Sequence, residues 1–427
     1  YRFESEHTKA LPQNHQSLGR RAMVRAVWDV DERLASVSAS FDFLISINPV
    51  GVDKLWSSFR KSRYDKLPPL RYPPMTIDPV LVKRQLFAVP IERIEDPTLS
   101  NIFYEKQSEI DRKLSMLLDR ASPRFLQGSV QLFGPVEKTL LRAAEEILER
   151  VPATARDAKT GGFVRAEELL KRANSELDYY RNQWSGFTGK ATISQDVLAG
   201  MMVSRDRLLI AAGTRTPASR VDALLQHEVG THLVTYFNGQ AQRLAHLKVG
   251  FAGYDELQEG LAVLCEYLAG GMTSARLRVL AVRVIAADMI MKGATFVETF
   301  RTLCRFGFSQ RMIFNITLRI YRGGGFTKDL IYLRGLWALL EHLRGGGELE
   351  PLFVGKIGIG HIAMIQGLRS RGVVTQPPLT PRVLERPAAL ERLARLRTGV
   401  SLFDLVERDG APPGASSEAE RSRPGRQ

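Results

Sequence analysis

The chain has 427 residues, of which 44% are hydrophobic and 25% are charged, and this composition is typical of a globular protein with a substantial core. Its two cysteines exclude a disulfide-stabilised scaffold and favour a reducing compartment, and charged residues interrupt every long apolar stretch, which excludes a simple membrane span. The formal net charge of +14 comes mainly from arginine. The sequence contains no helix-turn-helix, zinc-finger or RNP-type signature, so this charge indicates a solvated basic surface rather than a nucleic-acid-binding protein.

The first part of the chain mixes predicted helices with predicted strands. Residues 1–17 are polar and unpatterned, which indicates a loose arm. The spacing of apolar residues predicts helices over 18–43, 98–118, 136–151 and 163–183. Apolar runs of strand length predict strands over 80–91 and 125–133, and the prolines of residues 68–79 predict a break. We interpret residues 18–185 as an N-terminal α/β region.

The pattern changes after residue 186. Residues 190–212 predict an extended or hairpin segment, and helical periodicity then continues to about residue 368. Residues 186–375 form a second, mostly helical region, and residues 376–427 combine a basic, weakly helical stretch with a disordered tail. The chain is therefore predicted to be an α-rich α+β protein.

The sharpest motif is QHEVGTH at residues 226–232, on a helix for which Thr216 is the predicted N-cap and Pro217 the first helical residue. The leucines just before the motif define an inward face, and His227 and Glu228 continue it. Ionisable side chains on an inward face need partners, because burying them unpaired is costly. A metal ion is one such partner.

The two histidines of the motif, His227 and His232, lie five residues apart rather than the usual four. On an ideal α-helix this spacing separates the side chains by about 140° instead of about 40°. Both imidazoles reach one ion if the helix widens, as in a π-type bulge, or ends there, and Gly230 removes a side chain where the distortion must occur. Glu228, whose own carboxylate is free, is placed to act as general base on a metal-activated water.

Zinc in a hydrolytic site takes three protein ligands and leaves a fourth position for water. The sequence LQEGLA at residues 257–262 places Glu259 on the inward face of a helix that Asp255 is predicted to cap. Glu256 and Glu266 share roughly that face and are the rival ligands, or partners of the ligands. The predicted ligands of one Zn²⁺ per chain are His227, His232 and Glu259.

Together, QHEVGTH and LQEGLA resemble the QEGLA-motif family of bacterial proteins, which is related to the eukaryotic microtubule-associated tyrosine carboxypeptidases. The similarity covers residues 200–340 and includes MMVS at 201–204 and YRGGGFTKDLIY at 321–332. It implies a zinc peptidase with an HExxxH helix, a zincin-like metallopeptidase core, and the ligands and base already named. Specificity for tubulin is not implied, because bacterial members face no such tubulin tail.

In the segment 321–332, Arg322 and Lys328 flank three glycines. Cations beside flexible backbone amides are suited to gripping a carboxylate, as a carboxypeptidase must; a simple tight turn is the alternative. Tyr321 and Tyr332 are both candidates to donate a hydrogen bond to the oxyanion of the tetrahedral intermediate.

The extended residues Met202 and Val203 are predicted to bind substrate by strand addition; an ordinary structural strand is the alternative. These features together predict a cytoplasmic zinc metallocarboxypeptidase that hydrolyses a C-terminal peptide bond. Its expected partners are peptide or protein C-termini, acidic protein tails among them, without a specific nucleic acid or a membrane. The alternatives are a zinc endopeptidase or aminopeptidase, and a regulatory protein with a structural zinc site, for which a base at Glu228 would be unnecessary.

Overall fold

The computed structural model describes residues 23–153, 162–195, 197 and 200–406, so the predicted arm at 1–17 and the predicted disordered tail lie outside the described residues. The described chain is rich in α-helix and carries two small sheets, which confirms an α-rich α+β fold. The helices that precede the larger sheet are α2 (Arg25–Ala39), α3 (Phe43–Ile47), α4 (Val52–Lys61), α5 (Pro79–Phe87), α6 (Pro97–Leu118), α7 (Arg124–Phe133), α8 (Lys138–Arg150) and α9 (Ala166–Gln183).

Four of these helices, α2, α6, α8 and α9, confirm the predicted helices. The predicted strands over 80–91 and 125–133 are wrong, because both segments fold mainly as helices, α5 and α7. Asp78 caps α5 by accepting a backbone N–H, and the buried Phe125 and Phe133 mark one inward face of α7. A short apolar run fits a strand and a buried helix equally well, so periodicity alone does not separate the two.

The strands lie in the middle of the chain, as predicted for residues 190–212. They are β1 (Phe163–Arg165), β2 (Lys190–Ser194), β3 (Met201–Ser204), β4 (Arg207–Ala211) and β5 (Arg215–Pro217). β4 is central in the larger sheet, with β2 parallel to it and β3 antiparallel, so β3 forms an edge of this sheet. Thr216 pairs with Val164 in the sheet of β1 and β5, so the predicted helix cap at Thr216 is wrong and the helix begins at Val221.

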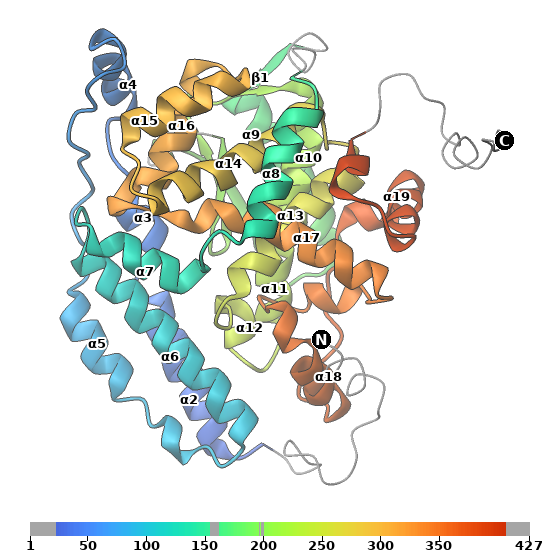
Figure 1. Ribbon diagram of the computed structural model, residues 1–427. Coiled ribbons are helices and arrows are strands. Elements are labelled where there is room, and N and C mark those ends of the chain that lie inside the picture. Colours follow the sequence, from blue (N-terminus) through green and yellow to red (C-terminus); the bar gives the residue numbers. More distant parts are fainter. Residues whose placement is uncertain (1–22, 154–161, 196, 198–199, 407–427) are drawn as a thin grey trace, which may run out of the picture.

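The remaining chain is almost entirely helical, as expected from its periodicity. Its main helices are α10 (Val221–His227), η4 (Glu228–Leu233), α11 (Val234–Gln240), α12 (His246–Val249), α13 (Tyr254–Leu268), α14 (Ser274–Met291), α15 (Phe296–Leu303), α16 (Gln310–Tyr321), α17 (Ile331–Arg344), α18 (Ile362–Ser370) and α19 (Pro387–Arg397). Figure 1 shows α13 and α17 side by side in the middle of the molecule, with α2, α5, α6 and α7 gathered at the lower left.

Two glycines bring α13 and α17 into direct backbone contact. A Cβ atom on Gly335 of α17 would lie 2.2 Å from the carbonyl oxygen of Glu256, and one on Gly260 of α13 would lie 2.5 Å from the carbonyl carbon of Gly335. Neither position has room for a larger residue without a shift of one helix. The crossing therefore sets how closely α17 approaches the helix that carries Glu259.

By length and composition alone, the stretch Arg25–Lys61 is long and apolar enough to cross a membrane. In the fold it is divided among α2, α3 and α4. The buried Asp31 of α2 lies 2.6 Å from Nδ1 of His246 in α12, and this contact ties α2 to the helical region. One side of the stretch thus packs against the protein's core, where Val30, Leu34, Ile47 and Phe59 are buried. The boundaries at residues 185 and 375 stay a prediction.

Candidate metal centre

A π-helical turn joins α10 to α11 and brings the two histidines of the motif together. In η4 the backbone hydrogen bonds span five residues instead of four, so side chains five positions apart lie on the same side of the helix. His227 and His232 therefore face each other, with ring centroids 5.1 Å apart. The predicted widening of the helix between them is confirmed.

Residues inside the turn favour this wide geometry. The Thr231 hydroxyl donates a 3.0 Å hydrogen bond to the carbonyl of Gln226, five residues earlier. A Cβ atom on Gly230 would lie 2.9 Å from the side-chain oxygen of Gln226, whose amide in turn donates to Glu176. Glycine at this position leaves that side chain in place, so the local sequence supports the turn.

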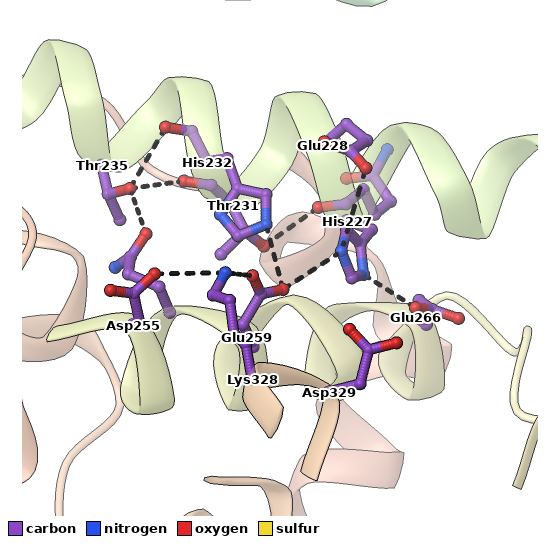
Figure 2. A network of polar contacts seen from close by, with 12 residues as sticks. His227, Glu228, Thr231, His232, Thr235, Asp255, Glu259, Glu266, Lys328 and Asp329 are labelled. Atoms are coloured by element: carbon purple, nitrogen blue, oxygen red, sulfur yellow. Dashed lines mark hydrogen bonds and ion pairs between the residues drawn. The ribbon is translucent and has the colours of Figure 1, made fainter. Parts of the chain in front are cut away.

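Three ligand atoms converge below the π-turn, as Figure 2 shows. One atom each from His227, His232 and Glu259 lies within 4.8 Å of the other two. Oε2 of Glu259 is 3.9 Å from Nε2 of His227 and 3.7 Å from Nε2 of His232. This oxygen is buried and has no hydrogen-bond partner among the described residues. A buried anionic oxygen that faces two imidazole nitrogens is the donor set that Zn²⁺ takes in a three-ligand site.

The other oxygen of Glu259 is occupied by Lys328. The Lys328 ammonium donates to Oε1 of Glu259 at 2.6 Å and lies 3.1 Å from Oδ1 of Asp255. Burial alone would raise the pKa of Glu259, but Lys328 and the two imidazoles hold that pKa well below its usual value. Lys328 thus lies at the site, as predicted, but its charge is engaged by carboxylates of α13. Asp255 lies in the first turn of α13, whose N-cap is Gly253 and not Asp255.

Glu266, one of the rival ligands, is instead a partner of His227. Its Oε1 lies 2.7 Å from Nδ1 of His227, which leaves Nε2 facing Glu259. Arg276 binds both oxygens of Glu266, and Arg220 adds a further ion pair. Burial alone would raise the pKa of Glu266, but these cations hold it well below its usual value. The other rival, Glu256, points away and pairs with Arg334.

Glu228 lies beside the ligands without being one of them. Its Oε1 is 4.0 Å from Nε2 of His227, and its side chain is 13% exposed. Burial raises the pKa of Glu228, while both histidines and the backbone N–H of Val203 oppose that rise. Since Val203 belongs to the edge strand β3, Met202 and Val203 lie on the strand that borders Glu228. The structure thus brings the predicted substrate strand to the predicted base.

The two candidate tyrosines have different surroundings. The ring of Tyr332 is stacked nearly parallel to that of His227, with centroids 6.4 Å apart, and its hydroxyl has no hydrogen-bond partner among the described residues. The Tyr321 hydroxyl is hydrogen-bonded to Thr299 and to the carbonyl of Ala294, outside the ligand cluster. Only Tyr332 is brought to the site.

Arg322 is not brought to the site either. Its guanidinium donates to Asn48 and lies over the ring of Phe326, 4.8 Å from the centroid, and burial lowers its pKa to about 10. The glycines that follow it form a turn with positive φ, and a Cβ atom on Gly323 would lie 2.5 Å from the ring of Phe125. Arg322 therefore lies in a tight structural turn outside the ligand cluster, and its predicted role in gripping a carboxylate stays a prediction.

Sequence reasoning missed a group of arginines around the cluster. They are Arg220, Arg276, Arg283 and Arg319. A sequence feature that could have revealed them lies in α14, where charged residues interrupt an otherwise apolar helix. Arg276 and Arg283 are seven residues apart there and share one face of the helix.

The family model of the microtubule-associated tyrosine carboxypeptidases matches residues 57–400, which include every residue of the cluster. No curated protein matches the chain.

Proposed function

The chain belongs to the microtubule-associated tyrosine carboxypeptidase family, and on this basis we propose that it is a zinc metallocarboxypeptidase with a zincin-like core, acting on a peptide or protein C-terminus in the cytoplasm. The family implies a tyrosine carboxypeptidase-like peptidase activity. The observation that carries the zinc dependence is the unpartnered, buried Oε2 of Glu259 between the Nε2 atoms of two histidines. Two free cysteines support the reducing compartment.

His227, His232 and Glu259 are the residues that would hold the ion, each through one free donor atom. Bound there, Zn²⁺ would supply a Lewis acid that acidifies a water molecule and polarises the scissile carbonyl. Glu228 accepts the proton of the attacking water and returns it to the leaving amine.

Two other groups act on the substrate. The Tyr332 hydroxyl is free to donate to the oxyanion that develops on the scissile carbonyl, since no described residue uses it. The edge strand β3 offers backbone groups to an extended peptide, and the N–H of Val203 already reaches Glu228. A peptide paired there lies across the ligand cluster, next to the base.

The proposal is tested with the purified full chain in two steps. Elemental analysis should find one zinc per chain, and removal by a chelator should abolish cleavage, with recovery on adding Zn²⁺ back. Mass spectrometry of a peptide-library digest should then show loss of single C-terminal residues. Zinc-dependent cuts inside the peptides or at their N-termini would replace the proposal by an endopeptidase or an aminopeptidase. Zinc without any cleavage would favour a structural site.

A further inference from the structure

The side of the cluster formed by His227 and Tyr332 is bordered by α14. Arg276 and Arg283 lie on the same face of this helix, two turns apart. Arg276 is fully engaged, because it binds both oxygens of Glu266 at 2.7 and 2.8 Å. Arg283 has no such partner, and it lies where the stack of His227 and Tyr332 ends.

The guanidinium of Arg283 is held in place but not neutralised. Its Cζ lies over the Tyr332 ring, 4.9 Å from the centroid, and its Nε is 3.6 Å from Oδ2 of Asp329. That distance is too long for a hydrogen bond, and none of the described residues makes one with Arg283. Its side chain is only 14% exposed, so water compensates little of its charge.

The nearest carboxylate is already taken. Arg319 binds Asp329 with two hydrogen bonds of 2.7 Å, one from Nε and one from Nη2, which is the bidentate arrangement that satisfies both oxygens. Arg283 and Arg319 therefore share one negative charge, and one positive charge is left over beside Tyr332. A planar guanidinium with free N–H groups is the side chain best matched to a carboxylate.

The direction of strand β3 places a chain end at this charge. Val203 of β3 reaches Glu228, and the turn after β3 brings Asp206 near Tyr236, one helical turn beyond His232. A peptide that pairs antiparallel with β3, the commoner arrangement, therefore runs from the Tyr236 end towards the His227 end. Figure 2 shows Asp329, the neighbour of Arg283, on the side of His227 and Glu266. The carboxyl terminus of the peptide thus points towards Arg283.

We infer that Arg283 binds the terminal α-carboxylate of the substrate, while its guanidinium rests on the ring of Tyr332. This inference rests on the proposed carboxypeptidase function and names the residue that makes the enzyme an exopeptidase. It assigns to α14 the role that the sequence suggested for Arg322 and Lys328, whose cationic groups are already engaged by Asn48 and by Glu259.

The test compares a peptide ending in Tyr as the free acid with the same peptide as its C-terminal amide. The wild type should prefer the free acid by roughly 10-fold to 150-fold in kcat/KM, the range expected for one charge-assisted contact. Arg283→Gln should lose this preference, mainly through KM, with little change towards the amide. The losses in kcat/KM caused by amidation and by the substitution should not add, because both changes remove the same interaction. Arg283→Lys should keep only part of the preference, since lysine lacks the planar fork.

Binding provides a second readout that does not require turnover. Calorimetry on Glu228→Gln should show tighter binding of the free acid than of the amide, and Glu228→Gln combined with Arg283→Gln should bind both alike. Arg311→Gln is the matched control, because Arg311 also stacks on an aromatic ring, that of Trp56 at 5.5 Å, and has no contact with the cluster. Its preference should equal that of the wild type.

The two possible failures are distinguishable. If Arg283→Gln and Arg283→Lys both keep the full preference for the free acid at unchanged zinc content, another group binds the carboxylate and the inference is wrong, while the carboxypeptidase function stands. If the wild type itself cuts the free acid and the amide equally well, or cuts internal bonds, the carboxypeptidase function fails, and the inference fails with it.

Discussion

At the scale of single residues, two of the three ligands in the cluster, His227 and Glu259, each have one donor atom tied and one left free. Glu266 holds Nδ1 of His227, and Lys328 holds Oε1 of Glu259. The free atoms, Nε2 and Oε2, then face each other across 3.9 Å. Partners of this kind orient a ligand before any ion binds. They also allow the residues that would hold the metal to be distinguished from Glu228, which would act as the base.

Glu228→Gln should keep one zinc per chain and lose turnover by about 10²–10⁴-fold, because the amide cannot accept the proton of the attacking water. Metal content by elemental analysis and kcat on the same preparation check this. Glu256→Gln is the control, since Glu256 pairs with Arg334 away from the cluster and should retain the wild-type rate. A Glu228→Gln protein without zinc would make Glu228 a ligand.

Glu259→Ala should nearly abolish zinc binding, because it removes the carboxylate whose buried, unpartnered Oε2 faces both histidines. Glu266→Gln should weaken zinc binding by a smaller factor, about 10–100-fold, since it changes the partner of His227 and leaves the three ligands in place. Competition with a chelator of known affinity measures both. The ligand assignment is wrong if Glu266→Gln loses the metal while Glu259→Ala keeps it.

At the scale of secondary-structure elements, the site depends on two local departures from regular helix packing. The π-turn η4 brings two histidines five residues apart onto one side. The contact of Gly260 with Gly335 lets α17 approach α13 closely, and Tyr332 lies one turn before Gly335 on α17. The positions of Glu259 and Tyr332 are thus set by the same crossing.

Gly335→Ala should lower the free energy of unfolding by about 1–3 kcal/mol, because its Cβ would overlap a backbone carbonyl that cannot rotate away. Denaturant unfolding measures the loss, and zinc affinity should decline with it as α13 shifts. Gly360→Ala serves as the control, since a Cβ atom there would have no neighbour within 4 Å. Equal stability of the two variants would mean that the helices can separate without cost.

At the scale of the whole molecule, buried charges of alternating sign connect the N-terminal helices to the site. Glu109 of α6 bonds to Lys106 and Lys113 and accepts the N–H of Gly253, the N-cap of α13. Burial alone would raise the pKa of Glu109, but the two lysines lower it to about 2. This carboxylate therefore stabilises the folded state and ties α6 to the helix that carries Glu259.

The folded-state pKa of Glu109 is below its unfolded value of 4.5, so its contribution is complete above about pH 4.5 and is lost as the pH falls towards about 2. Glu109→Gln should cost about 3–5 kcal/mol at pH 7, because Lys106 stays buried without its counter-charge. The cost should shrink as the pH approaches 2. Urea unfolding at several pH values measures this, with the exposed Glu105→Gln as control. A constant cost across the range would exclude the ionised Glu109 as its source.

Much of the site could be predicted from residue types and spacing alone. The motif around His227 predicted a metal helix, and the five-residue spacing predicted that this helix widens or ends between the histidines; the π-turn η4 is the first of these alternatives. Glu259 followed from a second acidic helix with an inward face, and Tyr332 and Val203 followed from neighbouring segments. Such properties are local, since helix periodicity decides which side chains share a face before any other element packs.

What sequence could not decide was which elements meet. The sequence predicted strands where α5 and α7 lie. Their short apolar runs fit a strand and a buried helix equally well, and only packing against other elements selects the helix. Sequence reasoning assigned the binding of the substrate carboxylate to Arg322 and overlooked Arg283, because residue type and spacing do not distinguish the surroundings of one arginine from those of another. Only the tertiary structure shows that the Arg322 guanidinium binds Asn48 and stacks on Phe326. The Arg283 guanidinium, by contrast, lies over Tyr332 without a hydrogen-bonded carboxylate. The charge left free at a site depends on every group packed around it, and those groups come from segments far apart in the chain.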